Sequence, residues 1–166
     1  MNGAKLSRAN LTRGKFIKTE IKDADLSGAD LSSSDFTKAT LSNTDLSRTN
    51  LKEANFTLAQ AKNTFLIGAD LREGNLQECC LSNADLSGAK LEKANLQKAQ
   101  INGANLHRAD LQEADLTQAN LQKSNLTGAK LVEASLKKAN LTDAIFDQAD
   151  LADANLKDAI GYKSAD

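Results

Sequence analysis

Proline and tryptophan are absent from this 166-residue chain, and tyrosine, methionine and histidine occur once each. Without proline, no X–Pro bond stiffens a loop and no backbone N–H donor is lost. With only five phenylalanines, leucine and alanine supply most of the apolar content. The net charge is −1, from 21 bases and 22 acids. This balance argues against a basic nucleic-acid-binding surface. It also argues against a strongly acidic protein that would take the place of nucleic acid on a partner.

Residues that carry chemistry are equally scarce. Cys79 and Cys80 are adjacent, and because neighbouring cysteines rarely pair, reduced thiols are expected. A single histidine, His107, excludes a multi-histidine metal site and gives a histidine-based triad weak support. Glycine-rich phosphate-binding motifs are absent. We therefore expect no catalytic residue, no metal site and no cofactor.

Long apolar segments are also missing. No run approaches the roughly 20 residues that a membrane span needs. The N-terminal residues have no signal-peptide core. These absences predict a cytoplasmic protein without membrane contact, unless a targeting segment has been removed.

What the chain does contain is a five-residue repeat. Between Ala104 and Lys123 it runs four times through a small residue, an Asn or Asp, a Leu and two variable polar residues. Taking the Leu as the centre, centres fall at every fifth position from Leu6 to Leu156 without a slip. Leu fills 24 of these 31 centres, and Ala stands two residues before 22 of them. Repetition this regular outweighs local propensity.

A period of five residues excludes an amphipathic α-helix, because successive centres would step about 140° around its axis. In an extended segment the small residue and the centre share a face. The next small residue lies an odd step beyond, so the chain must bend at every unit. The pattern predicts a coil of short extended sides with small residues and centres inside.

Three patterns indicate that one turn of the coil takes 20 residues. Phe16, Phe36 and Phe56 are spaced by 20, as expected for rings stacked in successive turns. Gly28, Gly68, Gly88 and Gly128 share one register and predict a common corner at which glycine eases the turn. Asn55, Asn75 and Asn95 predict a stacked amide ladder. We expect four sides and about eight turns.

The repeat resembles that of the pentapeptide-repeat family, small–Asp/Asn–Leu/Phe–x–x, over residues 4 to about 158. This resemblance implies an all-β fold, a right-handed quadrilateral β-helix. We expect one domain over residues 1–160 and a short tail over 161–166. The interior is expected to include Leu6, Leu11, Phe16, Phe36, Phe56, Leu106, Leu111, Leu116 and Leu121.

The regular pattern fails around Ala61, the one small residue among the centres. Leu58, Phe65 and Ile67 stand nearby in positions that should face solvent. Three explanations are open: Leu58 or Phe65 turns inward to refill the space, the three form an apolar patch for a partner, or a tolerant repeat has drifted.

Charge is unevenly distributed over the predicted sides. The side centred on Leu11, Leu31 and Leu51 carries ten acids and six bases, and is either solvated surface or a partner-binding face. Its candidate binding residues are Asp30, Glu53, Asp70, Glu73, Asp110, Glu113, Glu133 and Asp150. Residues 1–22 carry six bases and one acid, and residues 141–166 carry six acids and two bases. These ends either aid solubility or stack end to end, so a monomer and an end-to-end oligomer are both open.

These observations favour a non-catalytic scaffold that binds an unidentified protein partner and makes no direct contact with nucleic acid. The resemblance adds an alternative, since some family members mimic duplex DNA and bind DNA gyrase. The near-neutral charge argues against that alternative, as does the lack of projecting loops and of a C-terminal dimerising helix.

Overall fold

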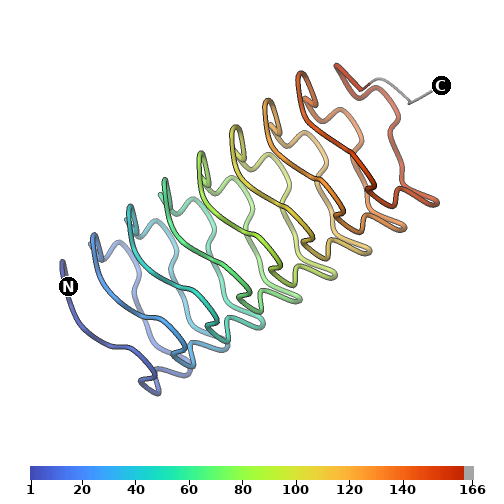
Figure 1. The fold of residues 1–166 in the computed structure, drawn as a ribbon. Helices are drawn as coiled ribbons and strands as arrows, with labels where there is room; N and C mark the ends of the chain where they lie inside the picture. Colours follow the sequence, from blue (N-terminus) through green and yellow to red (C-terminus); the bar gives the residue numbers. More distant parts are fainter. Residues whose placement is uncertain (163–166) are drawn as a thin grey trace.

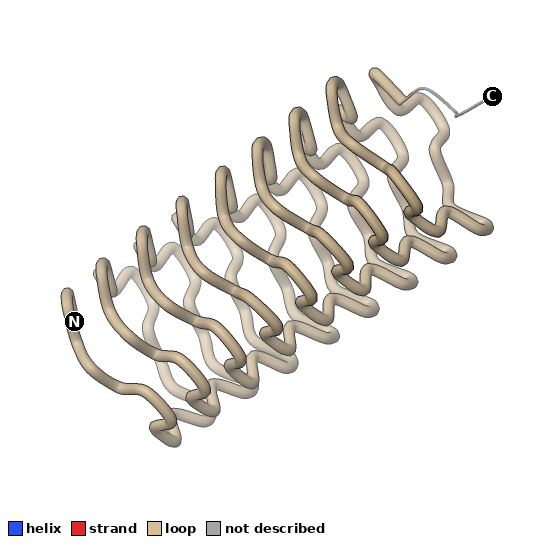
Figure 2. Tube along the Cα trace, viewed as in Figure 1, coloured by secondary structure: helices blue, strands red, loops and turns tan. Residues whose placement is uncertain are grey.

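Residues 1–162 form a single regular coil that advances along one axis, with residue 1 and residue 162 at opposite ends (Figure 1). The computed structural model describes residues 1–162. Within that range it contains no α-helix and no strand longer than one residue (Figure 2). Parallel β-bridges stand in place of strands at every fifth position. They run from Lys5 with Asp25 to Asn140 with Ile160. The last four residues of the predicted tail lie outside the described part of the chain.

Each bridge joins residues 20 positions apart, so one turn takes 20 residues and has four sides, as predicted. Leu6 N donates to Asp25 O at 2.7 Å, and Asp25 N donates to Ala4 O at 2.9 Å. At the corner, Arg8 N donates to Ser27 O at 2.9 Å. Bonds of this kind repeat along the coil and satisfy the backbone between neighbouring turns.

We name the four sides by their outward residues. Side A carries positions 5, 25, 45 and onward in steps of 20; side B carries 10, 30, 50; side C carries 15, 35, 55; side D carries 20, 40, 60. Two residues form each corner, for example 7 and 8 between sides A and B. Each corner is closed by a hydrogen bond from the N–H of the residue that follows it, as when Ala9 N donates to Leu6 O at 3.1 Å.

The second residue of each corner has a positive φ, whether or not it is glycine. In the A–B corner Gly28 has φ +64° and Gly68 +63°, while Arg8 and Arg48 in the same column have φ +57°. The predicted shared glycine corner is therefore confirmed, but every corner has the same backbone form. A Cβ at Gly28 would lie 3.5 Å from Arg8 Cγ, which is an ordinary contact, so glycine is favoured in this corner by its positive φ and not by lack of space.

Asn or Asp is favoured before each centre because its side chain caps the following corner. Asp25 Oδ1 accepts the Ser27 N–H at 3.0 Å, and Asn125 Oδ1 accepts the Thr127 N–H at 3.0 Å. Short polar side chains commonly bond the backbone two residues on in this way. The repeated acids are thus partly structural, even though they point outward.

Inward positions are filled by the predicted residues. Leu106, Leu111, Leu116 and Leu121 are all buried, with the small residues between them. Where serine or threonine takes the small position, its hydroxyl bonds a carbonyl: Thr64 Oγ1 donates to Leu41 O at 2.9 Å. Leu6 and Leu11 pack on the core but are only partly buried, because they belong to the first turn of the stack.

Both predicted ladders can be followed in the structure. Phe36 stacks on Phe16 and Phe56 with ring centroids 4.8 and 4.7 Å apart, which confirms the aromatic column. The amide ladder is confirmed in part: Asn95 Nδ2 donates to Asn75 Oδ1 at 3.3 Å, whereas Asn55 Nδ2 donates to Thr37 Oγ1.

The proposed rearrangement around Ala61 is wrong. Ala61 is buried, but Leu58 and Phe65 stay outside and are 37% and 47% exposed. The Phe65 backbone forms parallel β-bridges with Asp45 and with Asp85. Turning the ring inward would therefore need a one-residue shift in register that breaks both β-bridges. Leu58 is the second residue of its corner, with φ +60°.

Candidate functional site

The predicted acidic residues are brought onto one side and its edge. Asp30, Asp70, Asp110 and Asp150 lie in the outward column of side B. The second corner position between sides B and C carries Glu53, Glu73, Glu113 and Glu133. The column is not continuously acidic. Lys90 lies between Asp70 and Asp110 in the column, and Lys130 lies between Asp110 and Asp150.

Bases on the same side and corner pair with these acids. Lys52 Nζ lies 3.3 Å from Glu73 Oε1, Lys93 Nζ 3.6 Å from Glu113 Oε2 and Lys130 Nζ 3.3 Å from Asp110 Oδ2. Exposed pairs like these add little stability. They do lower the negative field that side B presents to a partner.

Asp70 and Arg72 form the tightest charged contact on this side. Arg72 donates through Nε at 2.8 Å and Nη2 at 2.5 Å to the two carboxylate oxygens of Asp70. These bonds lower the pKa of Asp70 and raise that of Arg72. Arg72 Nε also lies 4.0 Å from Glu92 Oε2, an atom that is buried and accepts no hydrogen bond from residues 1–162. The Arg72 guanidinium is therefore occupied by acids of side B and is not free to bind a partner.

The other aspartates with lowered pKa values are corner caps. Hydrogen bonds from the Ser32 hydroxyl and N–H lower the pKa of Asp30, and those from Ser27 do the same for Asp25. At Asp115 partial burial raises the pKa, but hydrogen bonds from Thr117 and Gln97 outweigh it, so the net shift is downward. These shifts fit structural carboxylates that stay ionised.

The three apolar residues predicted as one patch fall into two places. Phe65 points outward on side A, and Ile67 lies two residues on at the A–B corner, 41% exposed. Leu58 lies at the C–D corner, diagonally across the coil. The structure brings Phe65 and Ile67 together and separates Leu58 from them.

Sequence reasoning missed the arginines beside Ile67. Arg8 and Arg48 line a pocket of about 420 Å³ with Ile67, and neither has a carboxylate within 4.0 Å in residues 1–162. The signal was present, since Arg8, Gly28, Arg48 and Gly68 follow one another at 20-residue spacing.

The cysteines carry no visible chemistry. Both are free and buried, although Cys80 occupies a position that was predicted to face solvent. Its Sγ lies 3.4 Å from Ser82 Oγ. Burial raises the pKa of the Cys79 thiol well above its usual value, so Cys79 stays protonated. Over residues 1–162 no group of three or more potential ligands is placed to hold a metal ion.

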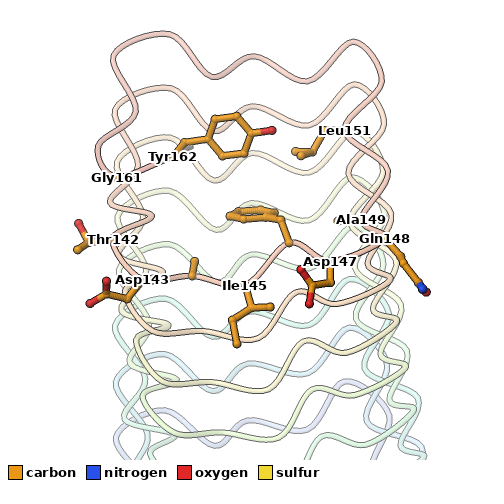
Figure 3. A pocket seen from close by; sticks show the side chains of 11 residues that line it. Thr142, Asp143, Ile145, Asp147, Gln148, Ala149, Leu151, Gly161 and Tyr162 are labelled. Atoms are coloured by element: carbon orange, nitrogen blue, oxygen red, sulfur yellow. The ribbon is translucent and has the colours of Figure 1, made fainter. Parts of the chain in front are cut away.

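A larger cavity, about 1230 Å³, opens on the last turn of the coil (Figure 3). The rings of Phe146 and Tyr162 meet edge to face with centroids 5.5 Å apart, and Tyr162 and Leu151 point toward the middle of this turn. The lining of the cavity includes Tyr162, the last residue that the structure describes. In the described part there is also no helix long and apolar enough to cross a membrane.

Comparison with known proteins identifies the repeat. The profile of the family described as pentapeptide repeats matches eight copies, over residues 1–32, 34–73, 49–88, 69–108, 79–118 and 119–158. A search of curated proteins found no match. Among solved structures, the chain is similar to HetL, a pentapeptide repeat protein involved in heterocyst differentiation regulation from the cyanobacterium Nostoc sp. strain PCC 7120. The identity is 36%, over 95% of this chain and 74% of HetL, with a TM-score of 0.61.

A second similar structure is full-length QnrB1, a plasmid-mediated fluoroquinolone resistance protein. It is 17% identical, over 96% of this chain and 85% of QnrB1, with a TM-score of 0.69, so this likeness concerns the fold alone. The architecture is the right-handed quadrilateral β-helix, as the resemblance implied. With family repeats along almost its whole length and this four-sided coil, the chain belongs to the pentapeptide-repeat family.

Proposed function

We propose that this protein is a rigid, non-catalytic scaffold that presents its outward columns to a protein partner. The observation that carries the proposal is the closely filled interior. Every centre from Ile21 to Leu141 is buried, and the small inward positions beside them are filled as well. Contacts with other molecules therefore fall to the sides, the corners and the ends. The backbone pairs turn by turn and holds those outward residues in fixed register.

The similarity to HetL supports a regulatory role exercised by binding. HetL is a pentapeptide repeat protein involved in the regulation of heterocyst differentiation, and it aligns with nearly all of this chain. A regulator without a catalytic site acts through contacts with other proteins. The proposal for this chain is therefore regulation through binding, and it does not extend to heterocyst differentiation.

Photocrosslinking tests the scaffold proposal directly. One photoreactive residue is placed on each side of the full chain, at Asn105, Asn50, Asn75 and Gln100, and the cells are irradiated. We expect a discrete protein adduct from one or two sides. Smears of equal intensity from all four sides, or no adduct from any, would contradict the proposal.

The alternative is a DNA mimic that binds DNA gyrase. Only the alignment of Asp30, Asp70, Asp110 and Asp150 on side B favours it. The lysines between these acids and the net charge of −1 oppose it. We expect no change in gyrase supercoiling, with or without a quinolone, when the protein is added. Inhibition or protection would favour the alternative.

Association between copies and location in the cell remain predictions. Sizing at low and high salt separates a monomer from salt-sensitive end-to-end oligomers, since opposite charges at the two ends attract less strongly when screened. Fractionation of the source cells tests the expected cytoplasmic location.

A further inference from the structure

The A–B corner near Ile67 combines a pocket, free positive charge and exposed apolar surface. The pocket holds about 420 Å³, and Arg8, Arg48 and Ile67 line it together with Ser27, Ser47 and Asp45. These residues come from successive turns, so the pocket runs along the corner.

The guanidinium groups in this pocket are available to a ligand. Within residues 1–162 neither Arg8 nor Arg48 has a carboxylate within 4.0 Å, whereas Arg72 on the next corner is paired with Asp70. The pocket's own acid, Asp45, accepts the Ser47 N–H at 2.8 Å as a corner cap. Two arginines against one aspartate leave a net positive charge that suits an incoming carboxylate.

Beside the arginines lies an uncovered apolar surface. Phe65 and Ile67 are roughly half exposed, and the next corner residues toward the C-terminus are glycines. Apart from each glycine and its two chain neighbours, no residue of the described chain places an atom within 4 Å of the position that a Cβ would take at Gly68 or at Gly88. A partner's side chain can therefore approach Ile67 without displacing anything.

Folding does not account for Phe65. From Asp25 to Asn125, every other outward residue of side A caps the corner that follows it: Asp25, Asp45, Asp85, Asn105 and Asn125. Phe65 has no oxygen with which to cap the Ile67 N–H, and it exposes an aromatic ring. An apolar residue at this place gives up a structural hydrogen bond, which favours a role in contact with another molecule.

We propose that this surface, formed by Arg8, Arg48, Phe65 and Ile67, binds an extended protein segment that carries an acidic and a large apolar side chain. The carboxylate lies between the arginines, and the apolar side chain rests on Ile67 over Gly68. The place between Arg8 and Arg48 lies level with Gly28, which is two turns from Gly68, or about 10 Å at about 4.8 Å per turn. Residues two apart in an extended chain are about 7 Å apart, and the Glu side chain extends over the remaining distance, so Glu-x-Leu spacing reaches both places. This site rests on the proposed function, because it assigns the scaffold's partner a chemistry.

A peptide titration tests the site. The ¹⁵N-labelled full chain is titrated with acetyl-Gly-Glu-Ala-Leu-Gly-amide to about 5 mM, a range that detects weak binding. We expect amide shifts confined to the surroundings of Arg48, Ile67 and Gly68, at least fivefold weaker binding when Lys replaces Glu or Ala replaces Leu, and weaker binding at high salt. Equal binding of the lysine peptide, shifts elsewhere or no shifts would overturn the proposal.

Matched variants distinguish specific peptide binding at this corner from nonspecific binding elsewhere on the surface. Arg48→Ser and Ile67→Ser are each expected to weaken peptide binding at least fivefold. Arg108→Ser, on the same corner, and Leu58→Ser, on the opposite one, should leave it unchanged. All four positions are outward, and dispersed amide spectra confirm that each variant folds. Equal effects at Leu58 and Ile67 would count against a specific site.

The remaining outcomes identify other occupants. Inorganic phosphate that binds as tightly as the peptide would indicate a small-anion site, and self-association lost in Ile67→Ser would indicate a second copy; either overturns the proposal. A partner crosslinked only through sides B, C or D, together with no peptide binding, would retain the scaffold and remove this site. Peptide binding without any cellular adduct would leave the site intact and contradict the scaffold.

Discussion

Two turns of the same coil, residues 104–123 and residues 59–78, differ in how completely their corners are capped. In the first, Asn105, Asp110, Asp115 and Asn120 each accept the N–H two residues on. In the second, only Asp70 and Asn75 do so, because Gln60 and Phe65 stand in the other two places. The backbone path is nevertheless the same, with a bridge at every fifth residue.

The two turns also place apolar residues differently. Four buried leucines fill the centres of residues 104–123, whereas the second turn has Ala61 at one centre and exposes Phe65 and Ile67. Residues 59–78 thus expose large apolar side chains, although the same turn has a smaller apolar side chain, Ala61, in its interior. The repeat thus keeps its backbone path despite two missing corner caps and one smaller centre, and a turn that departs from the pattern in this way is the better place to look for function.

The largest effect is expected from removing a centre of the regular turn. Leu116→Ala deletes a fully buried side chain and should lower the free energy of unfolding by about 2–5 kcal/mol. Denaturant unfolding followed by circular dichroism measures it. Leu58→Ala, at an exposed corner, is the control and should change stability by less than about 0.5 kcal/mol. Equal losses would mean that Leu116 contributes no more than a surface residue.

Overpacking the small inward position should have the next largest effect. Ala114 is buried beside Leu111 and Leu116, so Ala114→Leu should cost about 1–3 kcal/mol. Ala114→Ser is the control, because Ser124 occupies the equivalent position and donates to Leu121 O at 2.6 Å. Unchanged stability of Ala114→Leu in the same unfolding experiment would contradict a closely filled interior.

Phe65→Asn should make the irregular turn more like the regular one. Its Oδ1 would cap the Ile67 N–H, and its amide could donate to Asp45 as Asn105 Nδ2 donates to Asp85 Oδ1 at 3.1 Å. We expect unfolding free energy to rise by about 0.5–1.5 kcal/mol while peptide binding weakens. Phe65→Ala removes the ring without adding a cap and should weaken binding only. A less stable Phe65→Asn protein would show that the ring supports the fold.

The smallest effect is expected from the capping carboxylates. Asp115 has a lowered pKa in the folded chain, so the stability it contributes is complete above its ordinary value near 3.8 and is lost as pH falls through the folded value. Asp115→Asn keeps the cap but loses the charge that accepts from Gln97 Nε2 at 2.6 Å. The difference in unfolding midpoint between the unsubstituted protein and Asp115→Asn should therefore become smaller below about pH 4. A gap that stays constant to pH 2.5 would contradict this role.

Much of the fold could be predicted because a strict repeat carries its own geometry. The period of five excluded a helix, and the 20-residue spacing of Phe16, Phe36 and Phe56 predicted four sides and the observed ring stack. The acidic residues were correctly placed on one side for the same reason. Their pairing with Lys52, Lys93 and Lys130 depends on side-chain reach across turns, which the register alone does not specify.

The coil, its register and the set of inward side chains could all be read from the sequence, because each of these follows from residue spacing along an extended, regularly bent chain. The folded coil was needed to show that Phe65 stays outside, that Leu58 lies across the coil from Ile67, and that Arg8 and Arg48 share a pocket. Those outcomes depend on corner conformation and on the bridges between turns, which form only when turns stack on one another.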